Sequence, residues 1–194
     1  MNPVLQLNLF PLKFITTAFL LVILLPILAV LVLTQTGIET VSNSLVGFNE
    51  VRLTIQIKNP LDGKVVKEIT GPFIWPAQGI ITLEFGESSI YQPFHTGIDI
   101  AGKRGNPVVS FMSGKIISTN EISWGYGKHI IVDNGNNVTS LYAHLDNIYV
   151  SKGQDVLTGQ ILGAEGSTGW STGPHLHFET RVFGIPVNPR TFLK

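Results

Sequence analysis

The chain has 194 residues, and its 44% apolar content is raised by one dense block near the amino terminus. The remainder is enough for about one domain. The 13 basic residues balance the 13 acidic ones without a block of like charge, so the composition offers no footprint for nucleic acid. The sequence has no cysteine, which excludes thiol nucleophiles, thiolate metal ligands and disulfides. Any metal must therefore be bound by histidine and carboxylate side chains.

An uncharged apolar run extends from Phe14 to Leu33. As a helix it would rise about 30 Å, the thickness of the hydrocarbon core of a membrane. Lys13 precedes the run, whereas Glu39 and Glu50 are among the first charges after it, so the positive-inside rule places the rest of the chain outside the cytoplasm. A cleaved signal peptide is the alternative, but its apolar run is shorter, about 7–15 residues. We expect residues 1–36 to hold a short cytoplasmic tail and a single-pass transmembrane anchor of the cell membrane, with the remaining domain on the extracytoplasmic side.

Two β-rich runs follow the apolar segment. Residues 51–58 alternate between apolar and polar side chains, which is the period of a half-buried strand. The turn-forming residues 59–63 separate this run from a second one at 65–70. We therefore expect a β-hairpin spacer over residues 37–70. From 71 to 194, short β-rich runs alternate with Gly, Pro, Asn and Ser clusters, so the main domain is expected to be all-β.

The first candidate site segment is Phe94-His95-Thr96-Gly97-Ile98-Asp99. In an extended strand His95 and Asp99 would be about 13 Å apart, too far to share one ion. Gly97 has no Cβ and allows the chain to bend between them. The β-branched residue Ile98 then favours a strand, with Asp99 on the opposite face. The spacing alone is weak evidence for a metal site.

The segment from His175 to Glu179 is more informative because it alternates strictly. His175, His177 and Glu179 are expected on one strand face, and Leu176 and Phe178 on the other, toward a core. Two histidines two residues apart can both reach one metal site. One can bind the metal, while the other contacts a metal ligand or the bound substrate. The pattern does not decide which is which, and an exposed polar strand face is the alternative.

A similar alternation occurs in Leu141-Tyr142-Ala143-His144-Leu145. It places Tyr142 and His144 on one face, where the pair can donate hydrogen bonds or move a proton. His129 has no such companion and is expected to be an ordinary strand side chain.

Two histidine nitrogens and one carboxylate oxygen, with an open fourth position, are typical of a catalytic zinc site. Zinc lowers the pKa of its water and polarises a scissile carbonyl. Hydrolysis also needs a base and donors to the developing oxyanion, and the histidines that do not bind metal are the candidates. The same ligand types also bind iron in non-haem oxygenases.

The region from about Phe73 to Pro189 resembles the lysostaphin-like, or M23, zinc metallopeptidases, also called the LytM domain family. The resemblance spans about 115 residues in the family's order. The matching stretches are Trp75-Pro76-Ala77-Gln78-Gly79-Ile80 leading to Phe85-Gly86, His95-x-x-x-Asp99, Trp124-Gly125-Tyr126-Gly127, Leu141-Tyr142-Ala143-His144-Leu145, and Gly166-Ser167-Thr168-Gly169 leading to Gly173-Pro174-His175-Leu176-His177-Phe178-Glu179.

The resemblance implies an antiparallel β-sheet domain with a substrate groove over residues 71–194. It implies that zinc is bound by His95, Asp99 and His177, with catalytic support from His144 and His175. It further implies a zinc metalloendopeptidase that hydrolyses peptide cross-links of bacterial peptidoglycan, either glycine bridges or D-amino-acid cross-links. Some domains of this fold have lost ligands, so a non-catalytic module that binds the wall or activates other wall hydrolases is the alternative.

A further motif, Gly169-Trp170-Ser171-Thr172-Gly173, fits the Gly-x-Ser-x-Gly pattern of a serine hydrolase. In serine hydrolases with this pattern the serine lies on a nucleophile elbow, which requires a strand, a sharp turn and then a helix. Pro174 and an alternating strand pattern follow instead, so we interpret the run as a flexible rim of the groove.

Overall fold

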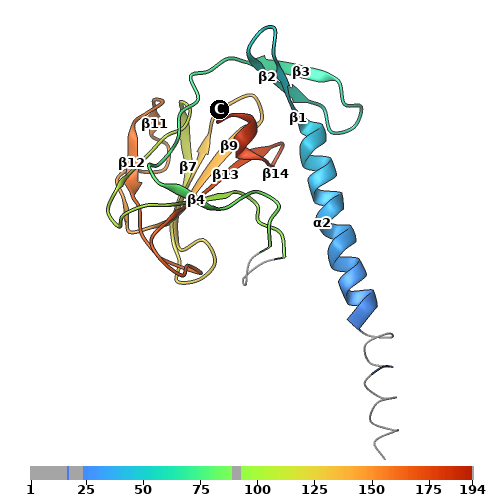
Figure 1. Cartoon of the computed structure of the whole chain (residues 1–194). Helices are drawn as coiled ribbons and strands as arrows, with labels where there is room; N and C mark the ends of the chain where they lie inside the picture. Colours follow the sequence, from blue (N-terminus) through green and yellow to red (C-terminus); the bar gives the residue numbers. More distant parts are fainter. Residues whose placement is uncertain (1–16, 18–23, 89–92, 194) are drawn as a thin grey trace, which may run out of the picture. The chain divides into compact units, whose positions relative to one another are not determined.

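The structure is a computed structural model that describes residues 17, 24–88 and 93–193 (Figure 1). It divides the chain into two compact units, 1–38 and 39–194, and the helix α2 (Leu25–Leu45) crosses the boundary between them. Part of the predicted membrane span, residues 14–16 and 18–23, lies outside the described residues. No helix in the described part of the chain is long and apolar enough to cross a membrane.

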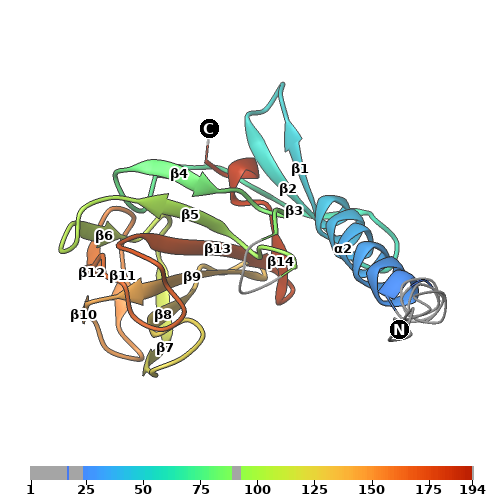
Figure 2. The same cartoon turned by 60° about the horizontal axis from the view of Figure 1, so that its bottom comes forward.

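The second unit is built from antiparallel strands, which confirms the predicted all-β class. Its largest sheet has eight strands in the described residues, in the order β11-β7-β8-β9-β13-β5-β4, with β14 paired to β13 (Figure 2). These strands are β4 (Ile80–Leu83), β5 (Ile98–Ala101), β7 (Gly114–Glu121), β8 (Lys128–Asp133), β9 (Val138–Leu145), β11 (Asp155–Val156), β13 (Leu176–Val182) and β14 (Ile185–Val187).

A smaller sheet and a short helix complete the main domain. The sheet has the order β10-β12-β6 and consists of β10 (Asn147–Ile148), β12 (Ile161–Ala164) and β6 (Pro107–Val109). The 3-10 helix η2 (Pro189–Thr191) follows β14 and begins after Asn188, whose side chain accepts a hydrogen bond from the amide of Arg190.

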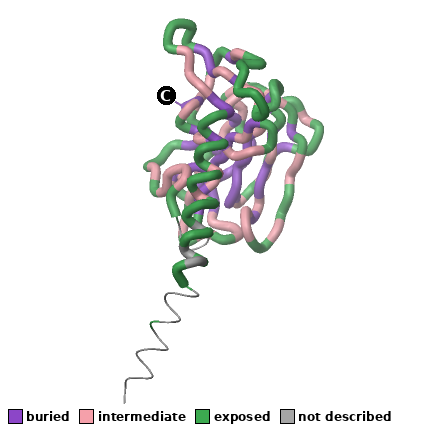
Figure 3. Tube along the Cα trace, turned by 90° about the vertical axis from the view of Figure 1, so that its right-hand side faces the viewer, coloured by how far each residue is buried: buried purple, intermediate pink, exposed green. Residues whose placement is uncertain are grey.

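The core lies on the face of the large sheet that carries the apolar side chains of β5 and β13. Ile98, Ile100, Leu176 and Phe178 are all at most 1% exposed, as their alternation with polar residues predicts. Figure 3 shows that buried residues concentrate in the strands, whereas α2 is mostly exposed. Burial of a side chain such as Phe178 contributes about 1.5–3 kcal/mol, so the apolar face fixes the direction of the polar one.

A three-stranded sheet precedes the main domain and differs from the expected hairpin spacer. It consists of β1 (Val46–Asn49), β2 (Thr54–Lys58) and β3 (Val65–Ile69) in that order. Residues 37–45, assigned by sequence to the spacer, continue helix α2. The apolar residues Leu45, Ile55 and Ile57 belong to the same buried cluster as the core of the main domain.

The strand predicted over residues 51–58 begins only at Thr54. The side chain of Asn49 accepts hydrogen bonds from the amides of Val51 and Arg52, both at 3.1 Å, and so closes a turn. Leu53 has a φ of 53°, a left-handed conformation that a strand residue does not adopt. Local turn chemistry therefore outweighs the alternating pattern at the start of this run.

Candidate metal centre and catalytic histidines

Two neighbouring strands bring Asp99 and His177 together. The two residues are directly paired in register where β5 and β13 run antiparallel. Their apolar neighbours point into the core, so both polar side chains point away from it. His95 enters from the loop before β5. A Cβ at Gly97 would overlap the carbonyl oxygen of Phe178, so the glycine lets this loop lie against β13.

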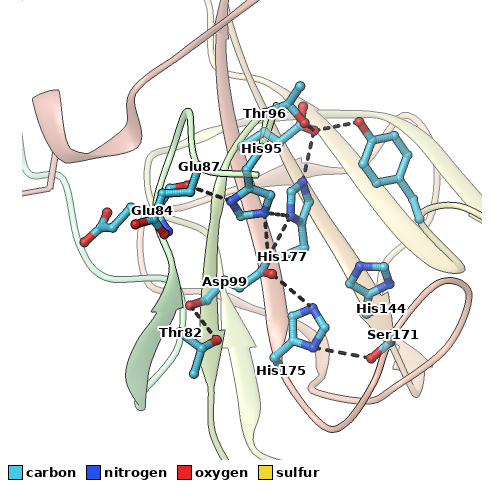
Figure 4. Close-up of polar contacts among 12 residues, drawn as sticks. Thr82, Glu84, Glu87, His95, Thr96, Asp99, His144, Ser171, His175 and His177 are labelled. Atoms are coloured by element: carbon cyan, nitrogen blue, oxygen red, sulfur yellow. Dashed lines mark hydrogen bonds and ion pairs between the residues drawn. The ribbon is translucent and has the colours of Figure 1, made fainter. Parts of the chain in front are cut away.

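The three side chains meet at one point (Figure 4). His95 Nε2 lies 3.0 Å from Asp99 Oδ1 and 2.9 Å from His177 Nδ1, and His177 Nδ1 lies 2.8 Å from the same Asp99 oxygen. In the described part of the chain, these residues form a group whose ligand atoms all lie within 4.8 Å of one another. The structure thus brings together the three residues that the resemblance implies as ligands.

Hydrogen bonds on the far side of each imidazole fix which nitrogen carries the proton. His95 Nδ1 lies 3.0 Å from the carbonyl oxygen of Glu84, and His177 Nε2 lies 3.0 Å from Glu179 Oε1. Both oxygens accept, so these nitrogens donate. If both rings are neutral, His95 Nε2 and His177 Nδ1 turn their lone pairs toward each other, and this approach becomes favourable only with a proton or a metal ion between them. The donor set therefore fits a bound metal ion.

Charges in the cluster support the same conclusion. Burial alone would raise the pKa of Asp99, but hydrogen bonds from His177 and His95 outweigh it and hold that pKa well below its usual range. Burial alone would lower the pKa of His177, yet its bonds to the Asp99 and Glu179 carboxylates raise it to about 9. The cluster stabilises positive charge at the point where the three ligand atoms meet.

Glu179 is a further candidate site residue, and the sequence did not reveal its contacts. It is fully buried, and its Oε1 accepts hydrogen bonds from Thr96 Oγ1 and Tyr126 OH, both at 2.6 Å, as well as from His177. Its Oε2 accepts from Arg181 Nη2 at 2.6 Å and Nε at 2.7 Å. Burial opposes ionisation, but these partners lower the pKa of Glu179 to about 2. A permanent anion thus orients the His177 ring.

His144 reaches the site through an irregularity in β9. Between β8 and β9 the register shifts from Lys128↔Leu145 to Ile130↔Tyr142, so Ala143 and His144 together oppose one residue. His144 has a φ of 61°, as in a β-bulge. The predicted pairing of Tyr142 and His144 on one face is therefore wrong. Tyr142 lies in the core against Phe178, with ring centroids 5.3 Å apart, while His144 lines the cavity.

The ring of His144 has a defined tautomer. Its Nδ1 donates to the carbonyl oxygen of Thr168 at 2.7 Å, which leaves Nε2 with a lone pair when the ring is neutral. Burial, followed by the charges of His177 and His175, lowers the pKa of His144 to about 4. At neutral pH the ring is thus an unprotonated base.

His175 lies just before β13, bridged to Gly166. Its Nδ1 donates to the carbonyl oxygen of Gly173 at 2.9 Å, and its Nε2 lies 3.7 Å from Asp99 Oδ2. The ring centroids of His144 and His175 are 4.7 Å apart. Both candidate catalytic histidines therefore bond the backbone through Nδ1, and His175 turns Nε2 toward the ligand cluster.

A cavity of about 670 Å³ joins these residues. The three candidate ligands and both candidate catalytic histidines line it, together with Leu83, Ile122, Trp124, Trp170 and Thr172. His129 also lines it, but its Nδ1 donates to the Gly127 carbonyl at 2.9 Å and its Nε2 lies 3.1 Å from the Asn120 amide nitrogen. The cavity is large enough for a segment of an extended substrate.

The serine hydrolase motif does not form a nucleophile elbow. Ser171 lies in the loop before β13, and the strand rather than a helix follows it. Its Oγ donates to the carbonyl oxygen of Gly173 at 2.7 Å and lies 2.9 Å from Ser167 Oγ. The same Oγ lies 3.3 Å from His175 Nδ1, but that nitrogen donates to the Gly173 carbonyl and so offers the hydroxyl no base. The contacts of Ser171 therefore hold the loop together and do not activate the hydroxyl.

Comparison with known proteins assigns the family. The sequence profile described as Peptidase family M23 matches residues 93–189, and the chain belongs to this family. Over 95 residues the chain is 45% identical to DD-carboxypeptidase/endopeptidase Mpg of Neisseria meningitidis serogroup B, which covers 49% of this chain and 22% of that protein. It is 38% identical over 119 residues to Murein hydrolase activator NlpD of Salmonella dublin, covering 61% of this chain and 30% of that protein.

A solved structure shares the fold. A zinc-containing peptidase from Vibrio cholerae superimposes with a TM-score of 0.59 and 30% sequence identity, over 72% of this chain and 46% of that one. The chain thus spans less than a third of the length of these two curated relatives and about half of this structural neighbour.

Proposed function

We propose that the chain is a membrane-anchored zinc metalloendopeptidase that hydrolyses peptide cross-links of bacterial peptidoglycan. The observation that carries the proposal is one cavity containing a complete ligand set and two further histidines with defined tautomers. His95 Nε2, Asp99 Oδ1 and His177 Nδ1 would hold the metal. Zinc bound there supplies Lewis-acid chemistry, which polarises a carbonyl and acidifies water.

The chain's own residues provide the proton transfers. Nε2 of neutral His144 accepts a proton from the attacking water and holds it for the leaving amine. Nε2 of His175, when protonated, donates a hydrogen bond to the negative charge that develops on the scissile carbonyl oxygen. The backbone carbonyls of Thr168 and Gly173 keep both rings oriented for these roles.

Metal analysis and wall digestion with the purified full chain test this function. We expect near-stoichiometric zinc, cleavage of walls cross-linked either by glycine bridges or by D-amino acids, loss of activity with a chelator and recovery with zinc. Full hydrolysis by a metal-free sample would contradict the mechanism. Recovery with ferrous iron but not with zinc would assign the site to iron.

A second candidate function is a non-catalytic activator of other wall hydrolases, supported by the similarity to the murein hydrolase activator of Salmonella dublin. The complete ligand and histidine set favours the enzyme. An activator would leave purified walls intact when tested alone, yet would increase the rate of an added wall hydrolase.

The membrane anchor is part of the proposal and rests on the apolar run and the charges around it. If the chain is oriented as proposed, a protease added outside intact cells degrades the domain after Gly37. Protection of that domain until the cells are lysed would reverse the orientation.

A further inference from the structure

Two exposed tryptophans lie at the cavity that contains the candidate site. Trp124 and Trp170 are 63% and 53% exposed, and both line this cavity. Their ring centroids are 6.4 Å apart, with the ring planes at 52°. Trp75, the third tryptophan of the chain, differs because the Arg190 guanidinium lies 5.2 Å from its ring centroid. Large exposed aromatic surface beside a cavity is typical of a ligand contact.

The loops that carry the two indoles are held together by their backbones. The Trp170 amide donates to the Gly125 carbonyl at 2.8 Å, and the Lys128 amide donates to Thr168 Oγ1 at 2.9 Å. A Cβ at Gly169 would overlap the backbone of Gly125, so the loops pack without intervening side chains. Hydrogen bonds therefore hold the backbone of the rim that the sequence suggested to be flexible, and this backbone sets the positions of the two residues that carry the indoles.

The chemistry around the indoles selects an uncharged ligand. Among the described residues that line the cavity, Asp99 is the only aspartate, glutamate, lysine or arginine, and it belongs to the ligand cluster. Thr172 lines the same cavity, is exposed and adds a hydroxyl. The surroundings of the two indoles thus offer planar apolar faces and polar uncharged groups.

Peptidoglycan contains one component with this chemistry. Its sugars are uncharged rings when N-acetylated, and their C–H bonds carry small positive charges that the negative face of an indole attracts. The two indoles together offer on the order of 200 Å² of exposed surface, far more than a glycine or alanine side chain of the peptide covers. The sugars are covalently joined to the peptides, so a ring at Trp124 and Trp170 is continuous with a peptide at the metal centre.

We propose that Trp124 and Trp170 bind an N-acetylated sugar ring of the wall glycan beside the peptide that is cut. The proposal rests on the proposed function for its substrate and extends it from the peptide to the glycan. It makes the indole pair a determinant of substrate choice, separate from the residues that perform hydrolysis.

Two matched substrates and one sugar probe test this proposal with the full chain. The substrates are a cross-linked muropeptide with its sugars and the same peptide without them, and the probe is a tetramer of N-acetylglucosamine. The variants are Trp124→Ala and Trp170→Ala. Tyr149→Ala is the matched control, because Tyr149 is 61% exposed and is not among the residues that line the cavity.

We expect each tryptophan variant to raise KM for the sugar-bearing substrate roughly tenfold, the scale of one lost aromatic stacking contact, with kcat almost unchanged. KM for the sugar-free peptide should stay the same, and Tyr149→Ala should change neither. An equal rise of KM for both substrates would overturn the proposal, because the pair would then bind peptide.

Titration with the sugar tetramer gives a readout that does not depend on hydrolysis. We expect it to shift the indole N–H signals of Trp124 and Trp170 in a nuclear magnetic resonance spectrum and to leave that of Trp75 in place. Absence of any shift would overturn the proposal. If the shifts occur but neither substrate is cut, the glycan site stands and the proposed peptidase function fails.

Discussion

The three candidate metal ligands and the two candidate catalytic histidines are positioned by different kinds of backbone. Asp99 and His177 lie in regular strands and face each other in register. His144 depends on a bulge, and His175 lies in the loop just before β13. Regular strands thus provide two of the three candidate ligands, the loop before β5 provides His95, and irregular backbone brings both additional histidines to the same cavity. Single substitutions are expected to separate the candidate ligands from the candidate catalytic histidines.

The largest effect is expected from removal of a ligand. His95→Ala, Asp99→Ala and His177→Ala each delete one of three protein bonds to the metal, so both metal content and hydrolysis should fall to background. Metal analysis of the purified variants is the measurement, with His129→Ala as a control that should keep its metal. If His175→Ala loses the metal and His177→Ala keeps it, then His175 and not His177 is the ligand.

Removal of a catalytic histidine should leave the metal in place. His144→Ala and His175→Ala keep all three ligands, so metal content should stay near that of the unmodified chain while hydrolysis falls roughly 10²- to 10⁴-fold. Metal content and kcat measured on the same preparation distinguish this class from the first. A loss of metal in both variants would show that the two sets of residues are not separable.

A smaller effect is expected at Glu179, which contacts a ligand and not the metal. Glu179→Gln replaces the anion that accepts from His177 Nε2, so metal affinity should fall roughly 10- to 100-fold. Competition with a chelator of known affinity measures the metal affinity of the variant. Glu165→Gln is the matched control, because Glu165 is also fully buried but accepts from the amide of Gly102. If Glu179→Gln and Glu165→Gln had equal metal affinities, Glu179 would not orient the His177 ring for metal binding.

The smallest effect on hydrolysis is expected at Ser171. Ser171→Ala removes hydrogen bonds within the loop and no reacting group, so hydrolysis should change less than about tenfold, the scale of one hydrogen bond. The measurement is kcat with metal content as the control. Near-complete loss with the metal retained would support a serine nucleophile.

Strand alternation explains how much of the site could be predicted. It placed Asp99 on the strand face opposite to that of Ile98 and Ile100. It likewise placed His177 on the face opposite to that of Leu176 and Phe178, because burial of the apolar face in the core turns the polar residues away from the core. The family resemblance decided between His175 and His177, and the structure brings His177 to Asp99 and His95.

The features that could not be predicted depend on contacts distant in the sequence or on broken alternation. Tyr142 and His144 were expected on one face because the pattern gives no sign of the bulge between them. Glu179 was placed on the correct face, but its bonds to Thr96, 83 residues away, and Tyr126, 53 residues away, exist only after the sheet has formed. Helix α2 likewise continues into residues 37–45, which the sequence assigned to the spacer.

The left-handed backbone of His144 implies a trade-off between stability and activity. A residue with a Cβ loses roughly 1–2 kcal/mol in this conformation, whereas glycine adopts it freely. His144→Gly should therefore unfold at a higher temperature than His144→Ala, by about 2–4 °C for each kcal/mol regained, although both lack the imidazole. Random substitutions selected only for thermal stability would favour glycine at this position, and selection for hydrolysis would restore the histidine.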